Sequence, residues 1–497
     1  MALDMRSAAG LSLAAMPIRA LLAAAVLLLA GGCTREERGP VRITAIGAPP
    51  SIANPNLAPL DPPSALLLEA TAQGLVRFDA AGEIEPALAQ SWIVSDDGLR
   101  YTFRIRRMQW IGGGRVTAEQ VVGRLRATLT AASRNPLKPI LGLVREIEPM
   151  TDEVLEITLR APRANFLELL AQPELAILTG SRGTGPYAPA PQPDGSILLN
   201  LPAGDDEEEE AIEPPIALRG ARASHAVARF MAGGADLVTG GTAGDLPIAR
   251  AAAPPAAAVR FDPVGGLFGV MFQGERGILA APAVRRALAM TVDREGIVAA
   301  LSVPGLGARA TLLPPGLEEV PAPAAPDWGG APLAVRRPEA ARIIAAATSA
   351  EPVPLRLRVA MPEGPGYRLI FAYLRRDWRA VGVEAERVAP DADADLRFVD
   401  SVAPATMAAW YLRNFTCERV RPCSGEADEA LAAARETQNV AERRVLLAKA
   451  DRMLTDAVLF VPIAAPVRWS LVSPRLTGFR RNVFGRHAPG ELIAGER

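Results

Sequence analysis

Apolar and polar positions along the chain alternate between helical spacing and strand-like spacing. Residues 64–78 place apolar side chains at near-helical intervals, whereas residues 101–106 and 155–159 alternate as strands do. Thr117 and Gln120 have the spacing of a capping box, in which a hydroxyl and an amide satisfy the first orphan N–H groups of a helix. We therefore predict a helix that begins after Thr117, in a chain that mixes helices with strands.

The second half of the chain repeats this mixture. Residues 282–301 have the pattern of one amphipathic helix, and Pro338 suits the first turn of another, where its missing N–H is not needed. A strand over 355–359, a helix over 370–378 and a strand over 383–388 form a unit of the βαβ kind. Strands with intervening helices predict an α/β fold.

Proline, glycine and acidic residues mark the predicted connections. The Gly- and Pro-rich residues 180–191 indicate a loop. The Pro-rich residues 251–258 and 314–326 indicate crossings or insertions between packed regions, with a domain boundary predicted near the first. Residues 205–210 are an unbroken run of carboxylates, which we assign to a solvated surface loop in preference to a cation site.

The composition is that of an ordinary globular protein, with 49% hydrophobic and 22% charged residues among 497. This length allows about three domains or two large lobes. With 54 Lys and Arg against 55 Asp and Glu, the chain has no net field that would attract nucleic acid or an anionic membrane. The two lysines, Lys138 and Lys449, are followed by Pro and Ala, which excludes the Gly-x-x-x-x-Gly-Lys-Ser/Thr loop of the P-loop nucleotidases.

The amino terminus has the features of an export signal. Arg6 and Arg19 precede an apolar run over 20–30, which is shorter than the ~20 residues that a membrane-spanning helix needs. The run continues into Leu-Leu-Ala-Gly-Gly-Cys, which resembles a bacterial lipoprotein processing site, although Ala30 stands where leucine is more usual. We expect Cys33 to carry lipid in a periplasmic protein, anchored to the outer membrane if the host is Gram-negative. A cleaved secretory signal with an incidental cysteine is the alternative.

Export also bears on the two remaining cysteines, Cys417 and Cys423. In an oxidising compartment they are expected to form a disulfide with each other. A metal site is the rival interpretation, but His225 and His487 are the only histidines and no Cys-x-x-Cys or His-x-x-x-His pair is present. We therefore expect neither a metal nor a cofactor.

A series of short motifs occurs along the chain in a fixed order. They are ATAQGL at 70–75, EPALAQSW at 85–92, SDDGLRYTF at 95–103, WIGGG at 110–114, VTAE at 116–119, GTGPY at 183–187, VRRALAM at 284–290 and VDR at 292–294. In sequence and in order they resemble the extracytoplasmic solute-binding proteins of peptide-type ABC importers, solute-binding family 5. The resemblance runs over nearly the whole chain beyond the export signal, which makes it far more specific than any single motif.

The resemblance implies a two-lobed periplasmic-binding-protein fold of type II, α/β in class, with two crossings between the lobes and a ligand cleft between them. We place the lipoprotein signal peptide at 1–32 and the first lobe at 33–258, with an inserted subdomain at about 76–168. The second lobe is placed at 259–460 and the return to the first lobe at 461–497. The implied function is capture of a solute without chemistry, and lobe closure would present a new surface to the membrane permease.

The same resemblance implies the partners. They are a peptide or other small solute and the permease and ATPase subunits of an importer. We expect a monomer that meets the membrane through its lipid anchor only and binds no nucleic acid. Members of this family also take nickel complexes, haem, opines or sugars, so the resemblance alone does not fix the ligand.

Asp400 is the candidate contact for a peptide ligand. In the peptide-binding members an aspartate of the second lobe pairs with the ligand's α-ammonium, and backbone groups of both lobes extend the peptide as an added strand. Asp400 follows a predicted strand over 396–399, where that aspartate would fall, but residues 397–404 are RFVDSVAP where the family has Trp-x-Ala-Asp-Tyr-x-x-Pro. A shorter alignment places Asp400 before the family tryptophan and leaves no ammonium partner. A solvated carboxylate at a strand end is the alternative role.

Three further residues are weaker candidates for the cleft. Trp410 suits the apolar part of a ligand, with core packing as the alternative. Phe268 comes just after the predicted first crossing. Asn54 belongs to an Asn-Pro-Asn turn that would border the cleft from the first lobe, although turn formation alone explains it. His225 lies in a helical pattern and is expected on the surface.

Two other functions remain as alternatives. An exported hydrolase is the less favoured, because the chain has no Gly-x-Ser-x-Gly elbow and no His-Glu-x-x-His motif, although acid pairs distant in the chain can meet in space. The second alternative is a lipoprotein of the same fold that acts as a ligand sensor or envelope partner without transport. It arises because the segment around Asp400 departs from the family pattern.

Overall fold

The computed structural model describes residues 39–201, 214–274, 277–349 and 355–493. The predicted signal peptide, Cys33 and the acidic run at 205–210 lie outside the described residues. All described helices and strands belong to one unit, Pro40–Arg497, and none of these helices combines the length and the hydropathy needed to span a membrane.

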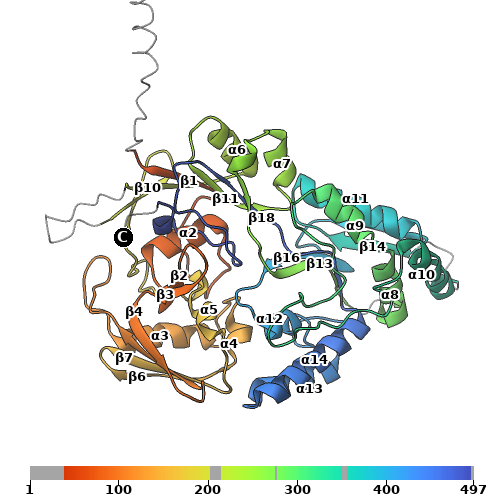
Figure 1. Ribbon diagram of the computed structural model, residues 1–497, viewed down its shortest axis with the longest axis horizontal. Helices are drawn as coiled ribbons and strands as arrows, with labels where there is room; N and C mark the ends of the chain where they lie inside the picture. Colours follow the sequence, from red (N-terminus) through yellow and green to blue (C-terminus); the bar gives the residue numbers. More distant parts are fainter. Residues whose placement is uncertain (1–38, 202–213, 275–276, 350–354, 494–497) are drawn as a thin grey trace, which may run out of the picture. The chain divides into compact units, whose positions relative to one another are not determined.

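A seven-stranded mixed sheet, here called the first sheet, is built around β1, which pairs in parallel with β10 and β11 (Figure 1). Its order is β12 (Val259–Phe261), β18 (Arg468–Val472), β11 (Leu237–Thr242), β1 (Val41–Ile46), β10 (Ile216–Ala221), β9 (Ile197–Asn200) and β8 (Ala188–Pro191). Val41 and Ile43 of β1 share a core with Leu66 and Leu67 of helix α2 (Pro62–Thr71). The same core includes Val472 and Leu492, so it packs β1 and α2 against residues from the last part of the described chain.

A five-stranded sheet, the second sheet, contains the predicted βαβ unit. Its order is β15 (Val383–Val388), β14 (Leu355–Ala360), β16 (Leu396–Val402), β13 (Gly266–Phe272) and β17 (Phe460–Pro462). Strands β14 and β15 run parallel and are joined by α11 (Pro365–Arg379), which confirms the predicted unit. Ile370, Leu374 and Trp378 of α11 are fully buried against the sheet, as their helical spacing predicts.

A four-stranded antiparallel sheet lies in the orange part of Figure 1, with α3 (Ala118–Leu129) close to β6 and β7. Its strands, in order, are β4 (Ala89–Val94), β5 (Arg100–Ile105), β7 (Val154–Leu159) and β6 (Val144–Thr151). The capping box is present as predicted: Thr117 accepts from the Gln120 N–H, and the Gln120 side chain accepts from the Thr117 N–H. This sheet has its own apolar core, separate from those of the two larger sheets.

Further elements cover or connect these sheets. They are β2 (Val76–Phe78), β3 (Ile84–Pro86), α4 (Lys138–Leu141), α5 (Phe166–Leu170), α6 (Ala223–Met231), α7 (Leu246–Ala251), α8 (Pro282–Thr291), α9 (Arg294–Leu301), α10 (Leu333–Thr348), α12 (Ala408–Arg413), α13 (Gly425–Glu436) and α14 (Val440–Ala457), with short 3₁₀ turns at 173–175, 256–258, 277–280 and 489–491. His225 is exposed on α6, as predicted.

The structure corrects two predictions in which a single helix was expected over too many residues. Helix α2 ends at Thr71, because Ala72 is extended and a side chain at Gly74 would come within 2.6 Å of the Leu170 carbonyl. The last residues of the predicted helix therefore form β2, which pairs with β3. Residues 282–301 form two helices, because Asp293 lies outside both and accepts from the Gly296 N–H as the cap of α9.

Two predictions based on proline are also wrong. Pro338 lies inside α10, which already begins at Leu333, so proline does not mark the first turn of that helix. Residues 188–191 form edge strand β8 rather than loop. Pro189 and Pro191 are tolerated there because an edge strand has one side without ladder hydrogen bonds.

The chain passes between the two larger sheets twice. Residues 262–265 join β12 of the first sheet to β13 of the second, and residues 463–467 join β17 back to β18. Here these two segments are called the crossings. Val238 of the first sheet and Val270 of the second belong to one continuous core, so apolar packing continues past the crossings.

Candidate functional site

A cavity of about 380 Å³ lies where strand ends of the two larger sheets meet. The second sheet contributes residues 400–404 at the end of β16, and the first contributes Thr239, Thr242 and Arg468 from β11 and β18. The other wall consists of residues 60–69 around α2, with Gln172, Glu174 and residues 484–487. Segments far apart in the chain therefore meet in one concave site of ordinary ligand size.

Asp400 lies in this cavity, and its carboxylate is already engaged on both oxygens. Arg468 donates from Nη1 to Oδ1 at 2.7 Å, and the Tyr367 hydroxyl donates to Oδ2 at 2.5 Å. The Asp400 side chain is only 5% exposed, so the altered motif produces a buried ion pair and not the solvated carboxylate considered as its alternative. Since Arg468 begins β18, this pair joins the second sheet to the first.

The electrostatics of this contact are dominated by burial. Desolvation raises the pKa of Tyr367, and the neighbouring Asp400 raises it further, so the phenol remains a hydrogen-bond donor. Desolvation alone would lower the pKa of Arg468, but the Asp400 carboxylate outweighs it and the net pKa is raised. Both donors therefore keep their protons in the presence of the buried carboxylate.

A second arginine–carboxylate cluster lies on the opposite wall. Arg486 Nη2 donates to Glu174 Oε1 at 3.3 Å and to Gln172 Oε1 at 3.2 Å. Glu69 Oε1, on α2, lies 3.9 Å from Arg486 Nη1, and its Oε2 atom is buried with no hydrogen-bond partner among the described residues. Desolvation raises the pKa of Glu69, and the charge of Arg486 opposes this only in part.

His487 also lines this wall, and it contacts Asp262 of the first crossing. Its Nε2 atom lies 3.1 Å from Asp262 Oδ2, and both side chains are nearly inaccessible, at 3% and 2% exposed. Asp262 also accepts from the Asn482 N–H at 3.1 Å, and the His487 ring packs 4.3 Å from that of Phe479. These contacts give His487 a structural role that holds the cavity wall to the crossing.

The structure brings two of the four predicted ligand contacts together. Trp410, on α12, lines the cavity with Asp400, and its half-buried ring packs edge-on against Tyr411 at 4.9 Å. Phe268 pairs with Asp400 across strands but lies fully buried in the core, where its ring meets Phe398 at 5.0 Å. Asn54 is exposed in its turn and accepts from the Asn56 N–H; it does not line the cavity.

Sequence reasoning missed the residues that surround Asp400 and Trp410. Glu69, Glu174, Arg468 and Arg486 belong to no recognisable motif, and Arg468 lies 68 positions from its partner Asp400. Arg486 and Glu174 are separated by 312 positions. No local signal marks such residues, because strand ends and turns bring them together only after the sheets have formed.

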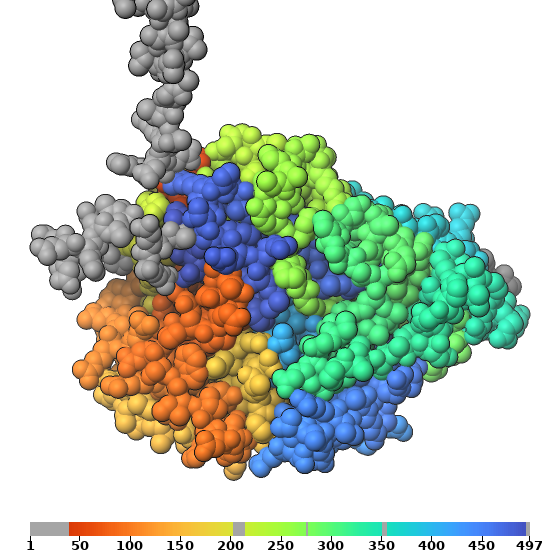
Figure 2. All heavy atoms as spheres, viewed as in Figure 1, coloured from red at the N-terminus to blue at the C-terminus, as the bar shows by residue number. Residues whose placement is uncertain are grey.

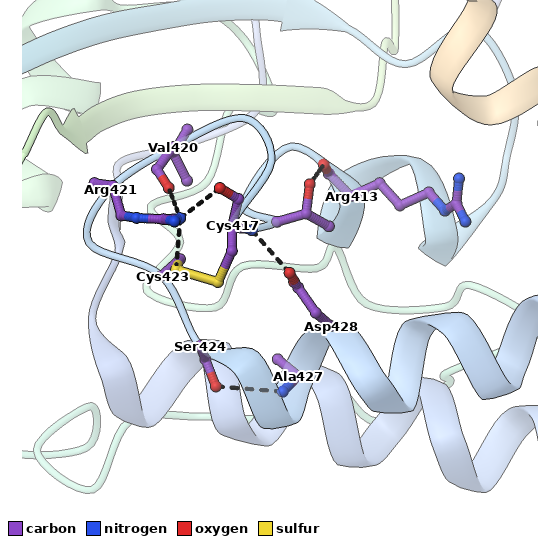
Figure 3. The surroundings of a disulfide bond; sticks show 9 residues. Arg413, Cys417, Val420, Arg421, Cys423, Ser424, Ala427 and Asp428 are labelled. Carbon is purple, nitrogen blue, oxygen red and sulfur yellow. Dashed lines mark hydrogen bonds between the residues drawn. A yellow bond between two sulfur atoms is a disulfide. The ribbon is translucent and has the colours of Figure 1, made fainter.

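Cys417 and Cys423 form a disulfide, as predicted, in the loop before α13 (Figure 3). Their Cα atoms are 5.1 Å apart, and Asp428 of α13 accepts from the Cys417 N–H at 2.9 Å. Arg421 donates to the Cys417 carbonyl inside the same loop. Within the described ranges, no group of three His, Cys, Asp or Glu side chains is arranged to hold a metal ion.

A family model, "Bacterial extracellular solute-binding proteins, family 5 Middle", matches residues 83–416, more than half of the chain. The chain belongs to this family. Membership supports the prediction of a binding protein and not an enzyme, because the family is one of solute-binding proteins.

Solved structures of family members share the fold. The murein tripeptide binding protein MppA of Escherichia coli superposes with a TM-score of 0.77 at 18% identity, covering 92% of this chain and 97% of its own. OppA of Haemophilus influenzae, in complex with the peptide RPPGFSPFR, gives 0.76 at 18% identity, covering 91% and 98%. The predicted two-lobed α/β fold of periplasmic binding proteins is thereby confirmed.

Curated relatives match over a shorter stretch. The nickel-binding periplasmic protein of E. coli K12 is 29% identical over 124 residues, which is 24% of each protein. The glutathione-binding protein GsiB of E. coli O1:K1 is 29% identical over 129 residues, covering 23% of this chain and 25% of GsiB. The chain thus matches about a quarter of the length of these relatives.

Proposed function

We propose that the chain is the extracytoplasmic substrate-binding lipoprotein of an ABC importer. In this proposal, two lobes whose boundaries lie at the crossings, residues 262–265 and 463–467, close over a solute and deliver it to the membrane permease. The cavity at Asp400 is the observation that carries the proposal, because elements of both larger sheets wall it and the Arg468–Asp400 pair spans them. A ligand that contacts residues of both larger sheets would favour the closed form by its differential affinity.

We further propose that the solute is peptide-like and carries both charges. Each wall of the cavity offers an acid and a base: Asp400 with Arg468, and Glu174 with Arg486. An ammonium and a carboxylate on one molecule would find complementary partners on either wall. Several relatives agree with this class, since they include OppA in complex with a peptide, a murein tripeptide binding protein and a glutathione-binding protein.

The direct test is to identify the small molecule that accompanies the protein. The protein is made in its native periplasm, denatured, and the released compounds are identified by mass spectrometry. A peptide or other zwitterion that rebinds in calorimetric titration supports the proposal. A released anion, cation or apolar compound would contradict the peptide-like class, and a compound converted to product during rebinding would contradict a binding protein.

Asp400 is proposed as the contact for the ammonium group. A carboxylate has about four acceptor positions, and Arg468 and Tyr367 occupy two, so an ammonium can still approach. A charge-assisted bond is worth about 1.5–3 kcal/mol, so Asp400→Asn is expected to weaken a free-amine peptide roughly 10- to 150-fold. The same variant should scarcely change binding of the amino-acetylated peptide, because that ligand already lacks the charge.

Four calorimetric titrations, of the wild type and Asp400→Asn with each of the two peptides, distinguish the loss of a direct ligand contact from damage to the fold. Equal losses for both ligands would indicate a disturbed fold, since a direct contact produces strongly non-additive changes. No loss for either ligand would favour the shorter alignment, in which Asp400 has no part in binding.

Lipid attachment at Cys33 is proposed from the processing motif. Replacing Cys33 with serine removes the thiol that would carry the lipid, so the variant is expected in the soluble periplasmic fraction. Fractionation of cells, with the wild-type mass measured for the lipid, provides the test. A variant that stays with the membrane, beside a wild type of unmodified mass, would contradict the anchor.

A further inference from the structure

A second hollow, of about 700 Å³, lies beside both crossings and is here called the crossing recess. Residues 262–264 of the first crossing and 465–467 of the second line it, together with the end of α7 and residues 302–306 after α9. In Figure 2 the yellow-green, green and blue segments that contain these residues meet around a recess in the face shown. The crossing recess is larger than the cavity at Asp400, and Arg468 lines both.

Most of the wall of the crossing recess is apolar. It includes Leu246, Ala249, Val259, Val264, Val303 and Leu306. These side chains come from three separate stretches of the chain, 246–249, 259–264 and 303–306, so the hollow is formed by tertiary packing and not within one loop. An apolar wall of this extent suits the hydrocarbon part of a small ligand.

Most of the charged side chains that line the crossing recess are positive. Arg250, Arg260 and Arg481 all line it, and in the described part of the chain none of them forms a salt bridge with a carboxylate. Arg250 donates to the Ser302 carbonyl at 2.9 Å and Arg260 to the Val259 carbonyl at 3.3 Å. Such bonds occupy donors but leave each guanidinium charge uncompensated, with further N–H groups free to bind.

The remaining charged residues of the lining do not offset these cations. Asp262 already accepts from the Asn482 N–H and lies against His487. Arg468 is neutralised by Asp400 on the cavity side. The crossing recess therefore keeps a net positive charge around an apolar hollow, with the three arginines that lack an ion pair set against the one carboxylate of Asp262. Arg250 and Arg481 are exposed and Arg260 is half-buried, so a solute can reach all three from outside.

We propose that the crossing recess binds a small amphipathic anion, with its hydrocarbon body in the apolar hollow and its carboxylate or sulfonate head on Arg260 and Arg481. Charge complementarity selects the head group, and apolar contact selects the body. This site is distinct from the cavity at Asp400 and does not depend on the proposed import function.

Three probes separate the two requirements. Decanoate has both the chain and the anionic head, acetate has the head alone, and decyltrimethylammonium has the same chain with a cationic head. Titration calorimetry of the purified chain should show one-to-one binding of decanoate, with acetate and decyltrimethylammonium each bound at least 10-fold more weakly. Equal binding of the cationic probe would overturn the proposal, because the arginines would then not contribute.

Variants locate the site. Arg260→Ala/Arg481→Ala should weaken decanoate binding at least 10-fold. Arg356→Ala/Arg358→Ala removes two arginines from β14, whose side chains are exposed, and should leave the binding unchanged. Trp410→Ala, in the cavity, should also leave it unchanged.

Several results would overturn the proposal. These are an absence of decanoate binding, a loss of binding in Trp410→Ala alone, or equal losses in both double variants. Thermal unfolding of each variant verifies that it is folded. If Arg260→Ala/Arg481→Ala fails to fold, Arg481→Glu alone replaces it, with the same expected loss.

Discussion

The cavity at Asp400 and the crossing recess share Arg468 but differ in how their charges are balanced. In the cavity Arg468 and Arg486 each face a carboxylate, at 2.7 and 3.3 Å. In the crossing recess Arg250 and Arg260 donate to backbone carbonyls, and neither they nor Arg481 form an ion pair within the described residues.

Burial accounts for part of the difference. Arg468 is largely withdrawn from water and lies beside the Asp400 carboxylate, which offsets the desolvation cost of several kcal/mol that a lone buried charge carries. Arg481 is exposed, so water solvates it and no partner is required. The Arg468–Asp400 pair therefore links the two larger sheets at the cavity, and the unpaired charges of the crossing recess remain available to a ligand.

The largest expected effect comes from breaking the buried pair. Asp400→Leu removes the partner of Arg468 and leaves a buried cation, which should lower the free energy of unfolding by about 3–5 kcal/mol. Urea denaturation measures this loss. The double variant Asp400→Leu/Arg468→Met, with no charge left, should recover most of it. A loss below about 1 kcal/mol in the single variant would show that the pair is effectively solvated.

An intermediate effect is expected at Glu69, whose pKa is raised by burial in the cavity wall. The native state then holds the Glu69 proton more tightly than the unfolded state does. The free energy of unfolding should therefore fall as the pH rises from the unfolded pKa, about 4.5, through the raised native pKa. Glu69→Gln cannot ionise, so urea denaturation across this pH range should show a smaller fall and a more stable variant at pH 7. A pH dependence identical to that of the wild type would contradict the raised pKa.

The smallest effect is expected in the crossing recess. Arg481 is exposed and makes no hydrogen bond or ion pair with the described residues, so Arg481→Ala should change the free energy of unfolding by no more than about 0.5 kcal/mol. The same urea denaturation allows direct comparison with Asp400→Leu. A loss above about 1 kcal/mol would mean that Arg481 is a structural residue, and the contrast between the two regions would disappear.

Local sequence patterns predicted many of the helices and strands. The capping box at Thr117 places the start of α3, because cap and helix lie within one turn of chain. The βαβ unit over β14, α11 and β15 was predictable because its periodicities of two and 3.6 residues reflect one buried face each. The predictions failed at helix ends where distant residues make contact: α2 ends at Thr71, shortly before Gly74 approaches the Leu170 carbonyl, and residues 282–301 divide at Asp293, whose N–H donates to Asp377 of α11.

The candidate site was predictable only in part. Asp400 was selected through a family resemblance and Trp410 as an aromatic residue suited to the apolar part of a ligand, and both line one cavity. Phe268 was selected because it lies near a crossing in the chain, but its side chain on β13 is buried in the core. A strand alternates its side chains between two faces, so a position in the chain near a crossing does not tell which face a residue takes.

By itself, the sequence determined the α/β class, the family, and the pairing of Cys417 with Cys423, since motif order, periodicity and cysteine usage are properties of the chain alone. Only the tertiary structure decided that Asp400 is neutralised by Arg468, and that Arg250, Arg260 and Arg481 gather unpaired around a second hollow. The physical reason is that electrostatic pairing depends on distance and burial in space. Both are set by how the sheets and the two crossings pack, and no local pattern of residues encodes them.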